Sequence, residues 1–277
     1  MTVVLLTKMF ASATPEELVE LVLELGLSGV DLAVREGHYV NPGNLRRALP
    51  EMAEVMKAHG LRVELVTTET VLIDPRDPVV RPLWRGCGEQ GIGNVKIGYW
   101  RWDETKRHRD QVDAIRGALE GFEALGREFG VRTLLHTHSG GNYGSNCSGL
   151  ADLLEGFDPQ FVGAYVDPAH LALGGEPLPM ALDIVRDWLA MVAVKNARRL
   201  PARDRDTMVW KADWCLLREG FVDWRVAVEN LRAAGYDGAL SLHGEYSGLQ
   251  EAAQVRRRLA EDASYLRSAL QAMDGPQ

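Results

Sequence analysis

The chain is poor in the residues that would mark a disulfide-bonded or a nucleic-acid-binding protein. It has only three cysteines, Cys87, Cys147 and Cys215, and they lie far apart, so neither a disulfide framework nor a CxxC site is predicted. The net charge is −8, from 31 basic against 39 acidic residues, and the longest run of Lys and Arg residues is 256–258. Binding to nucleic acid needs a basic surface, which this composition does not provide.

The chain also lacks a long apolar run. No stretch has the length of a membrane span. The apolar residues 3–6 are too few for a signal peptide, and no basic residue precedes them. We therefore expect a cytoplasmic protein with no membrane partner.

A repeated junction between a helix and a strand indicates the fold. Five polar, helix-like stretches end on a glycine that is followed by an apolar residue and then by a strand-like run; these glycines are Gly26, Gly60, Gly91, Gly130 and Gly235. Glycine in this position takes the left-handed conformation that ends a helix. Repetition at intervals of about 30–40 residues, in a chain of 277 residues, predicts a single (β/α)8 TIM barrel domain over residues 1–277.

Eight alternations of strand and helix follow from the pattern of apolar residues. Strands are expected at 3–9, 29–35, 62–69, 94–100, 132–139, 161–167, 191–196 and 238–245. Helices are expected at 15–26, 44–59, 78–90, 105–129, 150–157, 179–190, 223–235 and 250–272. The segments 139–148 and 197–222 are expected to be loops; the second is long and carries Trp210 and Trp214, which favours a lid or an apolar clamp over disorder.

Polar residues gather at the carboxyl ends of the predicted strands, where TIM barrels carry their active sites. His136 and His138 share one face of the fifth strand, and His243 and Glu245 share one face of the eighth. Facing the helices, these groups would be buried without partners, so we expect them to face the mouth of the barrel. Leu135, Val166, Val194 and Leu242 are expected on the helix-facing side.

Five motifs carry a resemblance to a known family: GVDLAVR on the second strand, HTHSG on the fifth, VDPAHLALGG on the sixth, KADWCLLREGFVDW at 211–224 and SLHGEY on the eighth. The chain resembles the xylose isomerase-like TIM barrels, which include sugar phosphate isomerases and epimerases. The better-known members hold one divalent metal through Glu, Asp, His and Glu on strands five to eight, and the two glutamates also transfer the proton.

This chain has a variant of that metal site. The corresponding positions are His136, Asp167, Ala193 and His243, so only the aspartate is retained. His136, Asp167 and His243 form a set of two histidines and one carboxylate, which suits Mn, Fe, Co, Ni or Zn. The alternative is that the histidines bind substrate in place of a lost metal site.

The remaining residues at the strand ends receive roles by their chemistry. Glu245 is the predicted general base, Lys195 would stabilise an enediolate, and His138 would transfer protons or bind hydroxyl groups. Ion pairs among Glu245, Lys195 and Asp167 are the structural alternative. Predicted contacts with substrate are His170, Arg35, His38 and Trp214.

The resemblance implies an enzyme that removes a proton next to the carbonyl of a sugar or polyol. Isomerisation or epimerisation would follow, or β-elimination from a 3-keto-glycoside, which shares the first step. A non-catalytic sugar-binding barrel is a third alternative. Endonuclease IV shares this barrel, but the acidic charge and Ala193 count against a metal-dependent phosphodiesterase. The expected partner is a small carbohydrate, and relatives are often homodimers or homotetramers.

Overall fold

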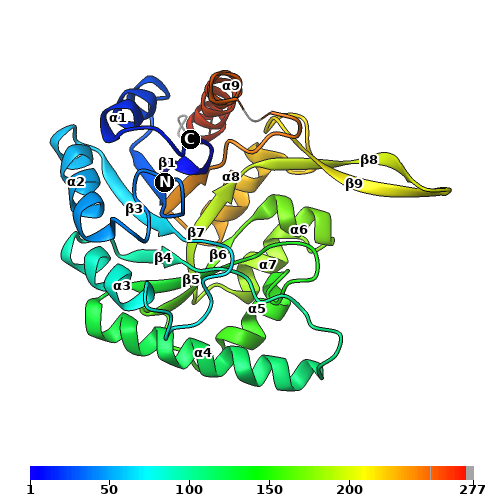
Figure 1. The fold of residues 1–277 in the computed structure, drawn as a ribbon. Helices are drawn as coiled ribbons and strands as arrows, with labels where there is room; N and C mark the ends of the chain where they lie inside the picture. Colours follow the sequence, from blue (N-terminus) through cyan, green and yellow to red (C-terminus); the bar gives the residue numbers. More distant parts are fainter. Residues whose placement is uncertain (250, 273–277) are drawn as a thin grey trace.

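In the computed structural model, which describes residues 1–249 and 251–272, eight parallel strands close into a barrel with helices around it (Figure 1). The order around the barrel is β1-β10-β7-β6-β5-β4-β3-β2. Its strands are β1 (Thr2–Leu6), β2 (Gly29–Ala33), β3 (Arg62–Thr67), β4 (Asn94–Lys96), β5 (Arg132–His136), β6 (Val162–Val166), β7 (Leu189–Val194) and β10 (Ala239–Leu242). The predicted TIM barrel is confirmed.

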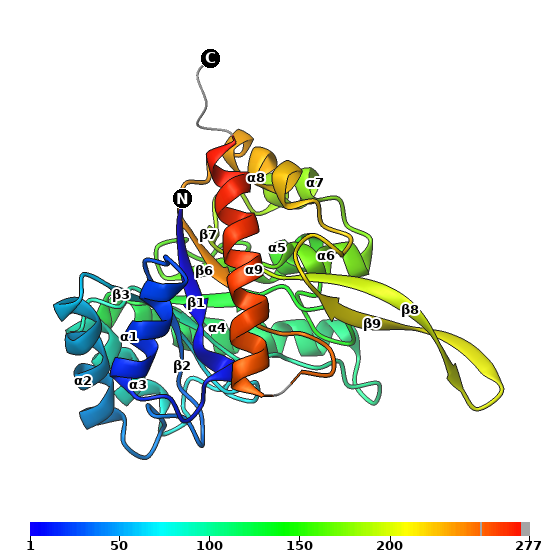
Figure 2. The ribbon, with the colours of Figure 1, turned by 90° about the horizontal axis from the view of Figure 1, so that it is seen from above.

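Helices cover the outside of the barrel, and β1 pairs with β10 to close it. Figure 2 shows α9 running beside β1, so that the last described helix lies on the same side of the barrel as the first strand. The helices are η1 (Thr7–Met9), α1 (Pro15–Glu24), α2 (Leu45–Ala58), α3 (Val80–Glu89), α4 (His108–Phe129), α5 (Cys147–Leu154), α6 (Pro168–Gly174), α7 (Leu178–Ile184), α8 (Trp224–Ala233) and α9 (Ala252–Gln271). None of the described helices is long and apolar enough to cross a membrane.

The five junction glycines have the predicted left-handed conformation, with φ between 66° and 78°. A residue with a β-carbon would be strained there, so glycine ends each helix and lets the chain turn back into the barrel. At the start of α1, Thr14 accepts a hydrogen bond from the backbone N–H of Glu17, and the Glu17 side chain accepts one from the backbone of Thr14.

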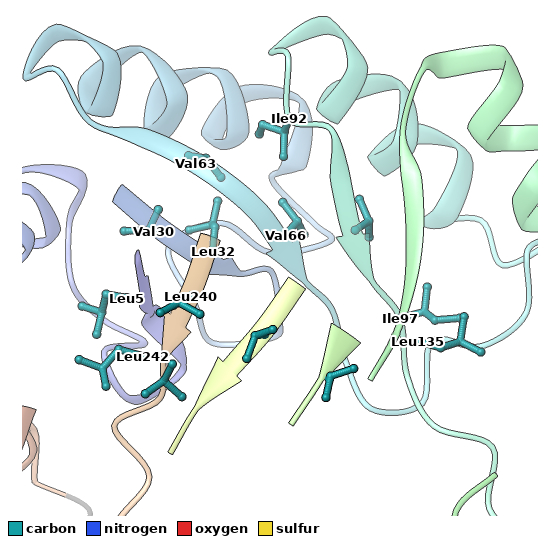
Figure 3. Packing of buried hydrophobic residues seen from close by; sticks show 14 of the residues in the cluster. Leu5, Val30, Leu32, Val63, Val66, Ile92, Ile97, Leu135, Leu240 and Leu242 are labelled. Carbon is teal, nitrogen blue, oxygen red and sulfur yellow. The ribbon is translucent and has the colours of Figure 1, made fainter. Parts of the chain in front are cut away.

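Apolar side chains pack on both sides of the barrel wall. Leu135, Val166, Val194 and Leu242 belong to the cluster between strands and helices, as predicted (Figure 3). A second cluster fills the interior: Val4, Leu65, Leu134, Tyr165, Met191, Ala193 and Ala239. Alternation along the strands separates the two sets, and the polar residues of the mouth continue the interior set.

The structure differs from the sequence prediction after the strands. The barrel strands end at or before the predicted ends, because the chain leaves the sheet where the polar residues of the mouth begin. The predicted loop 197–222 is largely a two-stranded hairpin, β8 (Asn196–Asp204) with β9 (Thr207–Cys215), that projects from the barrel (Figure 1). Helix α6 was not predicted. Residue 250, the predicted start of the last helix, and the chain end 273–277 lie outside the described residues.

Candidate active site

A polar pocket opens at the carboxyl ends of the barrel strands. Its lining is Leu6, Lys8, Arg35, Thr67, Thr70, Lys96, Tyr99, His136, His138, Tyr165, Lys195, His243 and Glu245. Six of the ten residues predicted for the site therefore line this one pocket. A larger hollow at the other ends of β3 and β4 contains none of them.

Asp167 lies at the base of the site and is completely buried. Its Oδ1 accepts hydrogen bonds from the backbone N–H groups of Ala169 (3.0 Å) and His170 (3.1 Å), so it caps α6. Its Oδ2 lies 3.2 Å from Nζ of Lys195 and 3.3 Å from Nε2 of His136. Burial would raise its pKa, but Lys195 and the nearby histidines hold it well below its usual range.

Lys195 is a buried cation held by three groups. Its Nζ donates to Oε2 of Glu245 (2.9 Å), lies 3.0 Å from Nε2 of His170, and contacts Asp167. The ring of Trp214 covers it, with 4.4 Å from Nζ to the ring centre. Burial lowers the pKa of Lys195, but Asp167 and Glu245 outweigh it and raise the pKa, so the side chain is an ammonium at neutral pH.

Glu245, the predicted base, is ion-paired to two lysines, Lys8 and Lys195. Burial would raise the pKa of its carboxyl group, but Lys195, then His243 and Lys8, hold it well below its usual range. A carboxylate with so low a pKa is a weak proton acceptor in the resting site.

A chain of buried hydrogen bonds orients His243. The hydroxyl of Tyr165 donates to Oδ2 of Asp31 (3.1 Å), which leaves its oxygen to accept from Nε2 of His243 (2.9 Å). Asp31 also accepts from the hydroxyls of Thr67 (2.6 Å) and Ser241 (2.8 Å). This pattern assigns the proton of a neutral His243 to Nε2. In this neutral form Nδ1 carries a lone pair; the atom is buried without a hydrogen-bond partner and lies 3.9 Å from Oε2 of Glu245, which a protonated ring would stabilise.

His136 has the opposite arrangement. The Tyr99 hydroxyl lies 2.9 Å from Nδ1, and burial holds the pKa of Tyr99 far above its usual range, so this hydroxyl keeps its proton and donates it. Nε2 of His136 then carries the ring proton. Burial lowers the pKa of His136 to about 3, so the ring is neutral at pH 7. The rings of His136 and His243 are stacked with centres 6.2 Å apart. The ring proton of His136 thus lies on the nitrogen that is 3.3 Å from Oδ2 of Asp167.

The other predicted residues divide into two groups. His138 and Arg35 line the pocket, and burial lowers the pKa of His138. His170 is buried behind Lys195, and its second ring nitrogen lies 2.8 Å from the hydroxyl of Ser139, so both nitrogens are engaged.

Trp214 and His38 do not line the pocket. Trp214, at the base of the hairpin, contacts the ring of His170 with centres 4.9 Å apart. His38 lies against the backbone oxygen of Lys8, with Nε2 3.3 Å from that oxygen. Their predicted contacts with substrate stay predictions.

The sequence interpretation missed several polar residues of the site. Lys8, Lys96, Tyr99 and Tyr165 line the pocket, as do Thr67 and Thr70, and Asp31 lies beneath it, bonded to Tyr165. A signal existed for two of them. Lys96 is a charged residue between the apolar residues Val95 and Ile97, and Tyr165 lies two residues before Asp167, so that their side chains point to the same side of the chain.

The donors at the mouth do not fit a resident divalent metal. The three predicted ligand atoms, His136 Nε2, Asp167 Oδ2 and His243 Nδ1, are all buried, and the first two lie 3.3 Å apart. However, the ammonium of Lys195 lies 3.2 Å from Oδ2 of Asp167 and supplies the positive charge there. Among the residues that the structure describes, no three His, Cys, Asp or Glu side chains are arranged to hold a metal ion.

Comparison with known proteins gives one family match for the chain. Residues 19–269 match the xylose isomerase-like TIM barrel family, whereas no curated protein matches the chain.

Three solved structures illustrate the similarity of fold. The 3-keto-D-glucoside 4-epimerase YcjR from E. coli is 15% identical, with a TM-score of 0.73 over 97% of this chain and 99% of that one. The probable 3-DHS dehydratase AsbF from Bacillus anthracis is 16% identical, with a TM-score of 0.69 over 96% and 99%. A xylose isomerase-like TIM barrel protein from Mycobacterium smegmatis, in complex with magnesium, is 17% identical, with a TM-score of 0.70 over 98% and 97%. Together with the family match over nine-tenths of the sequence, the barrel and its polar mouth establish that the chain belongs to the xylose isomerase-like TIM barrel family.

Proposed function

We propose that this chain is an isomerase or epimerase that removes a proton next to the carbonyl group of a sugar or polyol derivative. The observation that carries the proposal is the presence, in one pocket, of a fixed ammonium, Lys195, and a bare ring nitrogen, Nδ1 of His243. Removal of such a proton needs a base and a positive charge near the developing oxyanion. A cation already held in place loses little energy to reorganisation during the reaction.

In this mechanism His243 accepts the proton. Its Nδ1 has no competing partner, and the chain through Tyr165 to Asp31 fixes the ring and its tautomer. The imidazolium that forms would be stabilised by Glu245, 3.9 Å away. The Nε2–H group of His136 lies against Oδ2 of Asp167, 3.3 Å away, and neutral His138 can donate to a hydroxyl group of the substrate.

Glu245 and His170 then act mainly on Lys195. Both contact Nζ, so they hold the ammonium toward the pocket and set its charge. The role of Glu245 as base, predicted from the sequence, is kept as the competing assignment, because its carboxylate is on the same strand end as His243.

A lyase is the second candidate, since β-elimination from a 3-keto-glycoside begins with the same step. The fold similarity to a dehydratase favours including it. The two reactions differ in whether a leaving group departs, which analysis of products by NMR separates. A sugar-binding barrel without catalysis would bind the same compounds and exchange no hydrogen.

The test measures exchange of the substrate's α-hydrogen with D₂O by NMR, for a panel of ketoses, 3-keto-glucosides and their acids and phosphates. We expect exchange by the wild type, a loss of about 10²–10⁴-fold in His243→Gln, and a loss of about tenfold in Glu245→Gln. His59→Gln, at the exposed residue that follows α2, is the matched control and should exchange at the wild-type rate.

The reverse ranking, with exchange abolished in Glu245→Gln and kept in His243→Gln, would return the base role to Glu245. Binding of panel compounds by the wild type without any exchange would establish the non-catalytic barrel instead.

A further inference from the structure

Two basic side chains of the pocket have no acidic partner. Lys96, at the end of β4, is only 3% exposed, and Arg35 follows the end of β2. Neither forms an ion pair within 4 Å with any carboxylate of residues 1–249 and 251–272. Lys96 contacts the face of the Tyr99 ring, with Nζ 3.8 Å from its centre, and the buried Nε of Arg35 has no hydrogen-bond partner.

This arrangement is costly without a ligand. Keeping a buried lysine protonated without a counter-charge within hydrogen-bond distance costs several kcal/mol relative to water, and the alternative is loss of the proton. The chain does supply partners elsewhere, because Lys8 and Lys195 share Glu245, and Lys195 also contacts Asp167. Burial, and then the positive charge of Arg35, lower the pKa of Lys96 well below its usual range; the buried carboxylate of Asp31 opposes this shift by less than either. An anion between Lys96 and Arg35 would remove both penalties.

The position of the pair relates it to the chemistry. Arg35 and Lys96 come from β2 and β4, whereas Lys195 and His243 come from β7 and β10, on the other side of the same pocket. The hydroxyl groups of Thr67 and Thr70 lie in the lining between the two basic residues along the barrel. A small ligand can therefore place one end on each side.

We propose that Arg35 and Lys96 form an anion subsite and that the substrate is an acidic sugar derivative, with a carboxylate or phosphate on Arg35 and Lys96 and its carbonyl group near Lys195. The inference rests on the proposed function for the position of the carbonyl group. Guanidinium and ammonium groups both form charge-assisted hydrogen bonds with either oxyanion. A neutral sugar would leave both cations unpaired, so the subsite also excludes neutral sugars of similar shape.

Calorimetric titration of the full chain, at constant ionic strength, tests the subsite with three probes: D-gluconate, D-glucose 6-phosphate and neutral D-glucose. The wild type should bind at least one anion ten times more tightly than glucose, and the anion preferred identifies the oxyanion. Lys96→Met keeps the apolar part of the side chain and removes the charge, and Arg35→Gln keeps polarity. Each of these two substitutions should weaken binding of the preferred anion at least tenfold and leave the affinity for glucose unchanged. Lys57→Met, on the exposed surface of α2, is the control for loss of one positive charge. Circular dichroism confirms that each variant is folded.

Several results would overturn the subsite: no preference for either anion, or an equal loss of glucose and anion binding in the variants. A covalent adduct on Lys96 after borohydride treatment with a panel ketose would also do so, since it would make Lys96 a nucleophile. The exchange assay is a separate measurement. Anion preference without exchange would keep the subsite and reject the proposed function, and exchange without anion preference would do the reverse.

Discussion

On the β6–β7–β10 side of the pocket, the buried ammonium of Lys195 has two carboxylates within 3.2 Å, whereas on the β2–β4 side the equally buried Lys96 has none. The pKa shifts follow this difference: Asp167 and Glu245 raise the pKa of Lys195, and burial lowers that of Lys96. One side is electrostatically complete within the protein, and we infer that the other is completed by a ligand. The same residue type therefore contributes to stability with opposite signs on the two sides.

The largest effect is expected from Lys195→Met. It would leave Asp167 as an uncompensated buried charge, which costs about 3–5 kcal/mol of the free energy of unfolding. Hydrogen exchange of substrate should fall by about 10²–10³-fold, because the oxyanion loses its cation. Urea unfolding and the exchange assay measure the two effects. The double variant Lys195→Met/Asp167→Asn should regain most of the stability and none of the exchange; a regain of exchange would show that Lys195 has only a structural role.

A smaller effect of opposite sign is expected from Lys96→Met without ligand. The folded-state pKa of Lys96 lies below its unfolded value, so the unfolded chain binds more protons and the protonated lysine destabilises the fold. Removing it should raise the free energy of unfolding at pH 7 by roughly 1–3 kcal/mol.

The pH dependence checks the sign. Stability of the wild type relative to Lys96→Met should increase as the pH rises toward 10, because the lysine then loses its proton in the unfolded chain too. Urea unfolding at pH 7 and pH 9.5, with Lys57→Met as control, measures this. A loss of stability in Lys96→Met at pH 7 would mean that its contact with Tyr99 outweighs the desolvation.

We expect removal of divalent metal to have no effect on the hydrogen exchange of substrate. If the ammonium of Lys195 supplies the charge beside Asp167, purified protein should contain far less than one metal ion per chain, and EDTA should leave exchange unchanged. Elemental analysis and the exchange assay measure this. About one ion per chain, lost in His136→Ala and in His243→Ala, would establish the ligand set predicted from the sequence. It would also contradict the inference that the Lys195 side of the pocket is electrostatically complete within the protein.

Much of the fold could be predicted because local rules and the global fold agree. Glycines such as Gly26 and Gly130 end helices by a backbone requirement that does not depend on neighbours, and alternation separates Leu134 from Leu135 on the two sides of the wall. The β8–β9 hairpin was missed because most of its residues are exposed on both faces, so it has no apolar periodicity to detect.

The sequence could predict which residues form the site but not which side chains contact one another there. His136, Lys195 and Glu245 are polar residues at strand ends and could be found by position. Whether Asp167 faces a metal or Lys195 depends on side-chain geometry across two strands, which spacing does not encode. Asp31 was missed because it lies within an apolar strand, and its three hydroxyl partners come from three other strands.

The chain from His243 through Tyr165 to Asp31 has a consequence for how mutational data on this protein should be sorted. Asp31, Tyr165 and Ser241 are each at most 1% exposed, so a scan that classifies positions by burial would count them as ordinary core. Their substitution would nevertheless change the orientation and protonation of a ring nitrogen at the mouth. A comparison of abundance with activity across all single variants should therefore separate these three positions from apolar neighbours such as Val4, since their losses of activity would exceed what their losses of abundance explain.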